Sequence, residues 1–390
     1  MAKGRGVITH IEISGFKSLE KVSLDLGGLN ILVGTNASGK SNFFDALRVL
    51  QGIGYGLTIG EIFDGKPKGP GTEVWEGIRG GIENAVFREW SAEGNAFIRL
   101  AVRLRCPALE PDLRYEIVIF PKRALVRMET LGSGEAPIFH VSAPTADFDL
   151  ARPILQQFAK SKQCTEQDAE LIETCSRLMS DTQLLDPSPA FLRGYSTSQT
   201  VGRMGERGEN FAGLVKSILG DERNRAAYES WLKQLTPAEL DKVVVMEGAL
   251  REPLFAVKKN GHRIPAPLLS DGTLRFAALA AAFFQPDMPQ TLLVEEIENG
   301  IHPTRLRLLI ELLKSRTAGG RPQVMATSHS PLVLAWLTEE DYKTTFYCKK
   351  DEETGASTIT PLSEIPRFTE LARKQPAADL FAEGWLETAI

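Results

Sequence analysis

The chain has 390 residues, of which 43% are hydrophobic and 24% are charged, and its 45 Lys and Arg are slightly outnumbered by 50 Asp and Glu. Its length fits one large α/β domain with insertions or two domains, and the acidic balance excludes a strongly basic nucleic-acid-binding protein. The 4 cysteines are scattered, which argues against a disulfide framework or a zinc site. The longest apolar stretch, 276–284, is too short to span a bilayer. We therefore expect a cytoplasmic protein with no membrane contact and with reduced thiols.

The first elements surround a phosphate-binding motif. Alternating apolar and polar residues predict a hairpin from 8–13 and 22–26, and the apolar run 29–33 predicts a buried strand. A helix is expected over 40–50. Between strand and helix, Gly34–Ser41 reads G-x-x-x-x-G-K-S, in which backbone N–H groups and a lysine surround the phosphates of a nucleoside triphosphate. The predicted nucleotide-binding residues here are Gly34, Asn36, Ala37, Ser38, Gly39, Lys40, Ser41 and Asn42.

The predicted secondary structure changes twice in the middle of the chain. The glycines and prolines from 52 to 81 predict a loop or a mobile element, and the alternation at 96–104, 114–120 and 125–128 predicts an antiparallel sheet. Helical spacing over 153–236 predicts a helical insertion, and strands resume at 243–246 and 254–257. We therefore divide the α/β chain into three parts. They are an N-terminal lobe at 1–150 with the phosphate loop and the antiparallel sheet, a helical insertion at 151–240, and a C-terminal lobe at 241–390.

Two predicted strands of the C-terminal lobe end in polar side chains. The apolar run 291–294 ends in Glu295 and Glu296, which can hold Mg²⁺ and orient the attacking water, respectively. The run 323–327 leads to His329, which can reach a γ-phosphate. Taken alone, paired glutamates are usually a solvated edge, and a strand-end histidine is more often structural. Their order after a phosphate loop favours chemistry, so we predict Glu296, His329 and Lys40 as catalytic and Ser41 and Glu295 as metal ligands.

A second anion site is predicted at the start of the helix that begins near Ser270. Ser270 and Gly272 precede the run 276–284, and a serine with a glycine at a helix start can bind an anion. The alternative is an ordinary N-cap before a buried, alanine-rich helix. Because the chain already has one phosphate loop, a second site for the same nucleotide points to a partner subunit.

These motifs resemble those of ABC-type P-loop ATPases of the SMC, RecF and OLD-nuclease lineage. Gly34–Ser41 is similar to Walker A, 269–273 to the signature loop, Glu295-Glu296 to Walker B with its catalytic glutamate, and His329 to the switch histidine. The segment 298–303 resembles the one that follows Walker B in the OLD branch. The resemblance implies an ATPase head with an antiparallel β subdomain and a helical insertion, with ATP and Mg²⁺ as cofactors.

The same resemblance implies a homo-oligomer, at least a dimer, in which Ser270 and Gly272 of one subunit touch the γ-phosphate held by Lys40 of the other. Two residues depart from the usual pattern. Asp271 replaces the usual glycine of the signature, and Glu295 replaces the usual aspartate of Walker B. The Q-loop glutamine is not assigned, since Gln156 and Gln157 lie at the start of the helical insertion.

The chain lacks the heptad arms of SMC proteins and the acidic pattern of a Toprim nuclease. The resemblance therefore favours a stand-alone ATPase that regulates a separately encoded effector, a nuclease or a toxin, in bacterial anti-phage defence. The alternative is a RecF-like, ATP-gated DNA-binding protein of DNA repair, and a transporter subunit is disfavoured by Asp271 and the large insertion. The DNA-binding alternative needs a basic surface, for which the candidates are Arg99, Arg103, Arg105, Lys122, Arg123 and Arg127.

Overall fold

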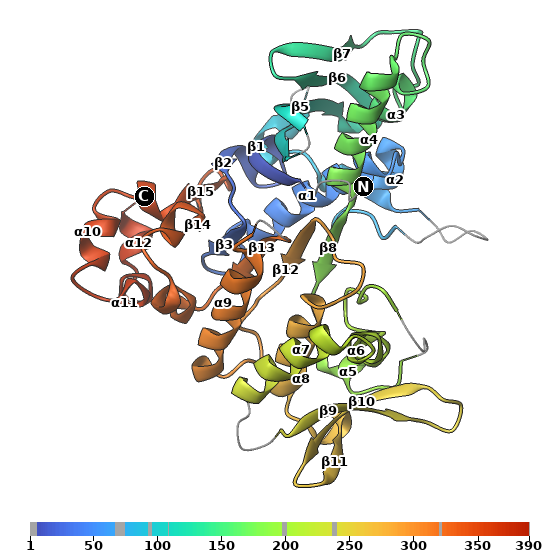
Figure 1. Ribbon diagram of the computed structural model, residues 1–390. Helices are drawn as coiled ribbons and strands as arrows, with labels where there is room; N and C mark the ends of the chain where they lie inside the picture. Colours follow the sequence, from blue (N-terminus) through green and yellow to red (C-terminus); the bar gives the residue numbers. More distant parts are fainter. Residues whose placement is uncertain are drawn as a thin grey trace. The chain divides into compact units, whose positions relative to one another are not determined.

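The computed structural model describes residues 6–66, 75–92, 96–107, 109–196, 201–235, 240–319 and 322–389. The chain forms two compact units, drawn as ribbons in Figure 1. Unit 1 consists of Met1–Thr182, Glu339–Glu370 and Leu386–Ile390. Unit 2 consists of Gln183–Thr338 and Leu371–Trp385. No helix in the described ranges combines the length and the hydropathy that a membrane span needs.

Unit 1 contains an antiparallel sheet with the strand order β2-β1-β4-β5-β6-β7. The strands are β1 (Val7–Phe16), β2 (Leu19–Asp25), β4 (Ile98–Cys106), β5 (Leu109–Phe120), β6 (Leu125–Ser133) and β7 (Ala136–Ser142). Ile98, Leu100 and Val102 are buried while Arg99, Ala101 and Arg103 alternate with them, which is the period of a half-buried sheet. The predicted hairpin and the predicted antiparallel sheet are confirmed.

The other strands of unit 1 hold the start of the phosphate loop. β3 (Leu29–Val33) runs parallel to β14 (Thr345–Lys350), and β15 (Ser357–Pro361) pairs antiparallel with β14. The turn between β14 and β15 is closed by Asp351, whose Oδ1 accepts the backbone N–H of Thr354 at 2.7 Å. An aspartate favours such a turn because its carboxylate can accept the backbone N–H groups that follow it.

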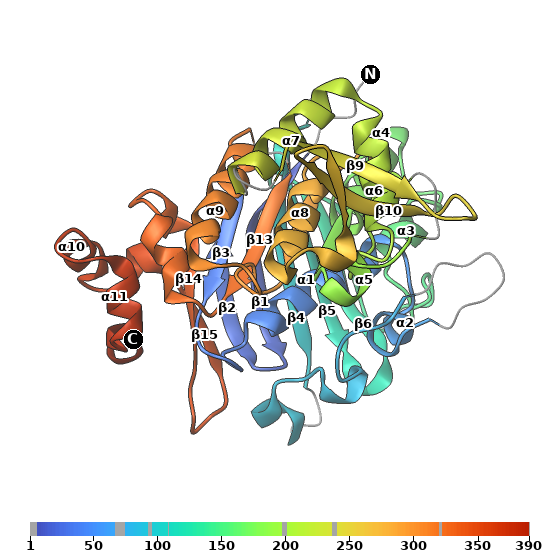
Figure 2. The same ribbon diagram turned by 90° about the horizontal axis from the view of Figure 1, so that it is seen from below.

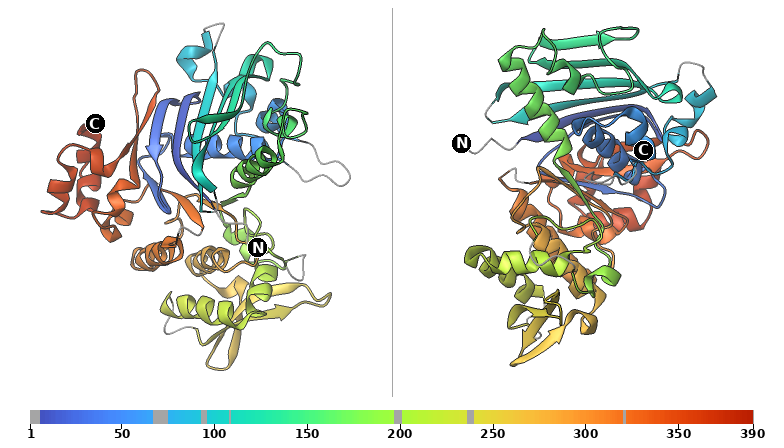
Figure 3. Two further views of the ribbon diagram at one scale, coloured as in Figure 1. Left: turned by 45° about the horizontal axis from the view of Figure 1, so that its top comes forward. Right: turned by 90° about the vertical axis from the view of Figure 1, so that its right-hand side faces the viewer.

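The helices of unit 1 are α1 (Lys40–Gly54), α2 (Ile59–Asp64), α3 (Leu155–Phe158) and α4 (Glu166–Ser180). Helix α1 packs against α4, and both contact the sheet (Figure 3). The loop predicted for 52–81 is wrong at α2, where Thr58 and Glu61 form a capping box and Ile62 is buried. Pro67 and Pro70, which supported that prediction, lie outside the described residues.

A carboxyl group is fully buried on the inner side of this sheet. Glu129 is 0% exposed, and it accepts hydrogen bonds from the Tyr115 hydroxyl at 3.0 Å and from the backbone N–H groups of Ile154 at 2.6 Å and Leu155 at 3.0 Å. Burial raises the pKa of Glu129 from 4.5 to about 7, and the three donors act in the opposite direction. The carboxyl therefore ties the segment at the start of α3 to β5 and β6.

Because the folded-state pKa of Glu129 lies above its unfolded value, the folded protein binds the proton more tightly, and this stability is present below about pH 4.5. It is lost as the pH rises through about 7. We expect the unfolding free energy to fall by on the order of 3 kcal/mol more in the wild type than in Glu129→Gln between these limits. Urea unfolding of both proteins across this range measures the difference, with the exposed Glu135→Gln as the control. Parallel pH profiles would refute the assignment.

Unit 2 contains the strands that carry the second set of motifs. β8 (Thr182–Leu185), β12 (Thr291–Val294) and β13 (Gln323–Ser328) lie in the order β13-β12-β8, with β12 and β13 parallel. A separate antiparallel sheet has the order β11-β10-β9, formed by β9 (Lys242–Glu247), β10 (Pro253–Lys259) and β11 (His262–Pro265). The strands predicted at 291–294, 323–327, 243–246 and 254–257 are thus confirmed.

The helices of unit 2 are α5 (Pro189–Leu192), α6 (Phe211–Leu219), α7 (Glu222–Leu235), α8 (Asp271–Ala282), α9 (Pro303–Thr317) and α11 (Ala377–Ala382). The C-terminal helices α10 (Phe368–Ala372) and α12 (Trp385–Thr388) complete the chain. Helix α8 is buried from Gly272 to Ala282, and α9 packs against α8 and β13 (Figure 2).

The helical insertion was predicted to be interrupted only by loops, and β8 corrects this prediction. The strand is only four residues long, so it has no measurable periodicity of its own. It forms because Leu185 C=O accepts the backbone N–H of Glu295, at the end of β12, at 3.1 Å. Among the cysteines, Cys106, Cys175 and Cys348 are buried and Cys164 is partly exposed.

Candidate functional site

The phosphate-loop motif lies in unit 1, between β3 and α1. Gly39 precedes α1 with φ +104°, and Ala37 has φ +61°, so the loop uses left-handed backbone at two positions. A Cβ on Gly39 would lie 2.4 Å from the Ser357 hydroxyl oxygen, which leaves no room for a side chain. The glycine of the motif is therefore required by both the backbone and its packing.

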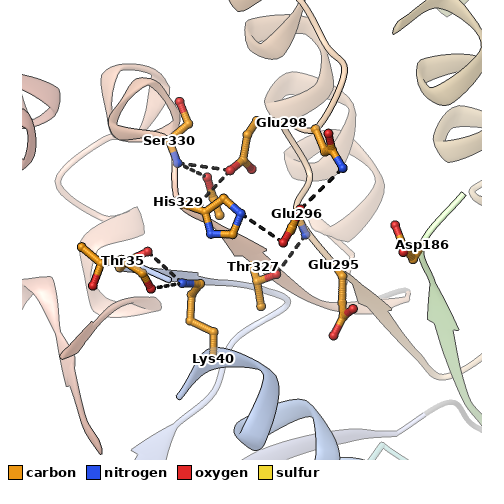
Figure 4. Close-up of polar contacts among 12 residues, drawn as sticks. Thr35, Lys40, Asp186, Glu295, Glu296, Glu298, Thr327, His329 and Ser330 are labelled. Atoms are coloured by element: carbon orange, nitrogen blue, oxygen red, sulfur yellow. Dashed lines mark hydrogen bonds and ion pairs between the residues drawn. The ribbon is translucent and has the colours of Figure 1, made fainter. Parts of the chain in front are cut away.

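Lys40 is 6% exposed and its ammonium group lies over the loop. Its Nζ donates to the carbonyl oxygens of Gly34 and Thr35, both at 2.7 Å (Figure 4). Asn42 at the same end of α1 donates to the Ser18 hydroxyl at 2.7 Å, while Ser41 is exposed. The loop thus presents a cation and a hydroxyl at the N-terminus of a 15-residue helix, which is the chemistry of an anion site.

Unit 2 holds the predicted carboxylates at the end of β12. Glu296 adopts φ +47°, which is rare for a residue with a side chain, and its backbone N–H donates to the Thr327 hydroxyl at 3.0 Å. Backbone strain of this kind is most often found at functional sites, and it persists where the surrounding structure holds the residue in place. The turn directs the Glu296 side chain toward His329, whose Nε2 lies 3.1 Å from Glu296 Oε1 (Figure 4). The structure therefore joins two of the three residues predicted to be catalytic.

The loop after β13 is held by a residue that the sequence did not single out as functional. Glu298 Oε1 accepts the backbone N–H groups of His329 at 2.7 Å and Ser330 at 3.2 Å (Figure 4). Its other carboxylate oxygen and Nδ1 of His329 are buried and have no hydrogen-bond partner among the described residues. Glu298 thus fixes the backbone that carries the histidine. The signal in the sequence was its place two residues after Glu296, in the segment similar to the OLD branch.

We expect Glu298→Ala to lower the maximal ATPase rate about tenfold with little change in KM, because two partly buried N–H groups lose their acceptor while the phosphate loop keeps its contacts. Glu298→Gln, which retains an acceptor oxygen, should keep most of the rate. Steady-state ATPase assays separate the two parameters. A large rise in KM alone, or equal losses in both variants, would contradict a positioning role.

A buried arginine connects the predicted signature helix to the carboxylates. Arg275 of α8 is 3% exposed, and it donates to the carbonyl oxygens of Glu295 at 3.0 Å and Glu296 at 3.2 Å. It also lies 3.2 Å from a carboxylate oxygen of Asp186. The motifs in the sequence do not include this residue, although a charge within a buried, alanine-rich helix is a usable signal, since a buried arginine needs partners.

The predicted signature residues also have local contacts. The Ser270 hydroxyl caps α8 by accepting the backbone N–H of Thr273 at 3.3 Å, and a Cβ on Gly272 would lie 2.4 Å from the carbonyl oxygen of Gly300. Asp271, the departure from the usual signature, is paired with Arg193. The N-cap alternative therefore describes Ser270 correctly, and it leaves the exposed Ser270 available to a further ligand.

The basic surface considered for DNA is partly neutralised. Arg99 is 2.6 Å from both Glu12 and Glu116, and Arg105 is 3.3 Å from Asp112. Arg127 lies over the ring of Phe120. Arg123 and Lys122 are exposed. The strand arginines thus offer less free charge than their number in the sequence indicated.

Two family models match the chain. Residues 208–335 match a family described as "AAA domain, putative AbiEii toxin, Type IV TA system", and residues 7–52 match a family described as "AAA ATPase domain". The second range contains the phosphate loop, and the first contains the signature helix, Glu295, Glu296 and His329. The protein is an ATPase.

Similar proteins agree with this class. A curated Helicobacter pylori protein named "ATP/GTP phosphatase" is 22% identical over 365 residues, which cover 89% of this chain and 93% of that protein. A solved SMC head bound to the C-terminal winged-helix domain of ScpA covers 90% of this chain and 97% of that one, at 15% identity and a TM-score of 0.56. A Pyrococcus furiosus SMC head with an extended coiled coil, bound to the C-terminal domain of ScpA, covers 94% of this chain and 100% of that one. Its sequence identity is 14% and its TM-score is 0.53.

At these identities the solved structures show the fold, which is the α/β fold of an SMC-type ATPase head with antiparallel sheets and helices. The motifs and the family models identify a P-loop ATPase, and its fold is similar to that of the SMC heads. The predicted fold class is confirmed.

Proposed function

We propose that the protein is an ATP-driven switch that oligomerises around ATP and regulates a separately encoded effector, a nuclease or a toxin, in bacterial anti-phage defence. The observation that carries the switch is Arg275, which joins the signature helix to the backbone of Glu295 and Glu296. A movement at the signature therefore reaches the carboxylates through a rigid contact. The description of the matching family as a putative AbiEii toxin of a type IV TA system supports a role alongside toxin systems.

The proposed ATP site divides its roles among the predicted residues. The backbone of Gly34, Asn36, Ala37, Ser38 and Gly39 surrounds the phosphates, with Lys40 as the cation and Asn42 at the helix start. The Ser41 hydroxyl and the Glu295 carboxylate are oxygen donors of the kind that Mg²⁺ prefers, so these residues fit that ion. Glu296 orients the attacking water and His329 senses the γ-phosphate.

In the proposed assembly, Ser270 and Gly272 of one copy meet ATP that is held by Lys40 of another copy. The exposed Ser270 at the N-terminus of the 12-residue helix α8 supports this role, because a helix start favours an anion. The division into parts at 1–150, 151–240 and 241–390 stays a prediction, as does a cytoplasmic location.

Light scattering of the Glu296→Gln protein with and without Mg-ATP tests the assembly. We expect a nucleotide-dependent rise in mass, because ATP that is bound but not hydrolysed keeps the copies together. The Lys40→Ala protein serves as the control and should show no rise. If the mass of Glu296→Gln does not respond to ATP, the proposed ATP-bridged assembly is wrong.

The RecF-like alternative predicts ATP-dependent binding to duplex DNA that weakens steeply with salt. The ion pairs of Arg99 and Arg105 lie on the surface that this alternative needs, and they disfavour it. A salt titration of DNA binding with and without ATP separates the two functions. Tight, ATP-dependent and salt-sensitive binding would favour DNA repair over effector control.

A further inference from the structure

The outer face of the unit 1 sheet is hollowed by a cavity of about 520 Å³, which is within the size range of ligand sites. The hollow lies on the polar side of the strands β1, β4, β5, β6 and β7. Small residues at its floor, Ala101 and Gly132, leave room between larger charged neighbours. No residue proposed for ATP binding or hydrolysis lines it.

On one side of the hollow, the charged side chains form ion pairs with one another. Arg99 reaches Glu12 and Glu116 on the two neighbouring strands, at 2.6 Å each, so one guanidinium holds both carboxylates. The hydrogen bond from Arg99 lowers the pKa of Glu12, so this carboxylate stays ionised near neutral pH. These three groups satisfy one another and leave little capacity for a ligand.

The other side holds two arginines that face each other across neighbouring strands. Arg103 of β4 lies directly opposite Arg114 of β5 in the strand register, and both side chains are exposed. Like charges in this position destabilise a sheet. In the ranges that the structure describes, neither guanidinium forms an ion pair. Thr130, His10 and His140 also line the hollow, where the Thr130 hydroxyl is 2.7 Å from His140 Nδ1 and His10 Nδ1 is 2.7 Å from Asp25 Oδ1.

We propose that this hollow binds a carboxylate group of an acidic peptide segment on a partner protein, held by Arg103 and Arg114. A guanidinium binds a carboxylate through two parallel hydrogen bonds, and two adjacent guanidinium groups can hold one acidic side chain from both sides. An anion there also removes the repulsion between the two arginines. The expected partner is the proposed effector, and only this identification of the partner rests on the proposed function.

The charge of the lining disfavours nucleic acid as the occupant. Arg99, Arg103 and Arg114 are balanced by Glu12, Glu116 and Glu135, so the hollow has no net attraction for a long polyanion. A DNA backbone carries a charge about every 1.7 Å, and its neighbouring phosphates would meet these carboxylates. A peptide can present one carboxylate to the arginines and uncharged groups to the rest.

Fluorescence anisotropy of the full chain with a labelled serine-rich peptide that carries a single glutamate tests the proposal. We expect saturable binding that weakens at least about tenfold in the double variant Arg103→Gln and Arg114→Gln, because the paired charged hydrogen bonds are lost. Arg105→Gln is the matched control, since Arg105 belongs to the same strand but is paired with Asp112. The thermal unfolding midpoint of each variant checks that the sheet is intact.

Absent binding by the wild type, equal loss in the Arg105→Gln control, or equal binding of a peptide with glutamine in place of glutamate would each overturn the proposal. A duplex DNA probe that binds and is lost in the double variant would also overturn it, in favour of nucleic acid. The double variant should keep the wild-type ATPase rate. The ATP-dependent mass of Glu296→Gln tests the proposed function separately, so a failure of one does not decide the other.

Discussion

Replacing Glu296 with glutamine is expected to lower the rate of ATP hydrolysis about 100-fold to 1,000-fold while ATP binding is retained. Glutamine has the same shape as glutamate but cannot accept a proton from the attacking water. Glu296 is held in place by its strained backbone, by the Thr327 hydroxyl and by His329, so the amide should occupy the same position. Phosphate release under saturating Mg-ATP measures the rate.

Glu311→Gln is the control for this substitution. Glu311 is also a glutamate of unit 2, but it forms a surface ion pair with Arg307 on α9, at 2.7 Å. Such pairs contribute little to stability, and this variant should hydrolyse ATP at the wild-type rate. If Glu296→Gln also retained that rate, the assignment of Glu296 to the attacking water would have to be abandoned.

Replacing Lys40 with alanine is expected to weaken ATP binding by about 100-fold or more, because charged hydrogen bonds contribute about 1.5–3 kcal/mol each and Lys40 can donate several. The ammonium is already desolvated, at 6% exposure, and is held by the carbonyl oxygens of Gly34 and Thr35. It therefore needs little further desolvation when it meets phosphate. Isothermal titration calorimetry with a non-hydrolysable ATP analogue measures the affinity.

The matched control is Lys21→Ala, which removes an exposed lysine from β2 of the same unit. Its affinity for the analogue should equal that of the wild type. A Lys40→Ala protein that bound ATP normally would show that the phosphates are held elsewhere. Thermal unfolding without nucleotide distinguishes a lost ligand contact from a damaged loop.

Local patterns in the sequence were sufficient for most elements of the fold. The hairpin, the antiparallel sheet, the strands β3, β12 and β13 and the helix α1 were all predicted, because each has a clear periodicity or a glycine-rich boundary. The short elements were not predicted. β8 depends on a hydrogen bond to Glu295, and α2 depends on a capping box inside a glycine-rich segment.

The residues of the candidate site also divide into those that the sequence predicts and those that only the structure reveals. Residue type and spacing were enough to propose Lys40, Ser41, Ser270, Glu295, Glu296 and His329, because phosphate and metal chemistry require particular groups near strand ends and helix starts. The supporting residues could not be assigned from spacing. Glu298 acts on a backbone 31 positions away and Arg275 on carbonyl groups 20 and 21 positions away, and only folding brings such groups within hydrogen-bond distance.

The sequence by itself determined that this chain binds a nucleoside triphosphate, since the geometry of a phosphate loop is encoded in eight consecutive residues. Only the tertiary structure decided which charges are free. The arginines of β4 and β5 have the same alternation in the sequence, yet Arg99 is neutralised, whereas Arg103 and Arg114 form no ion pair within the described part of the chain. The physical reason is strand register, because the neighbour of a side chain across a sheet is set by pairing between strands.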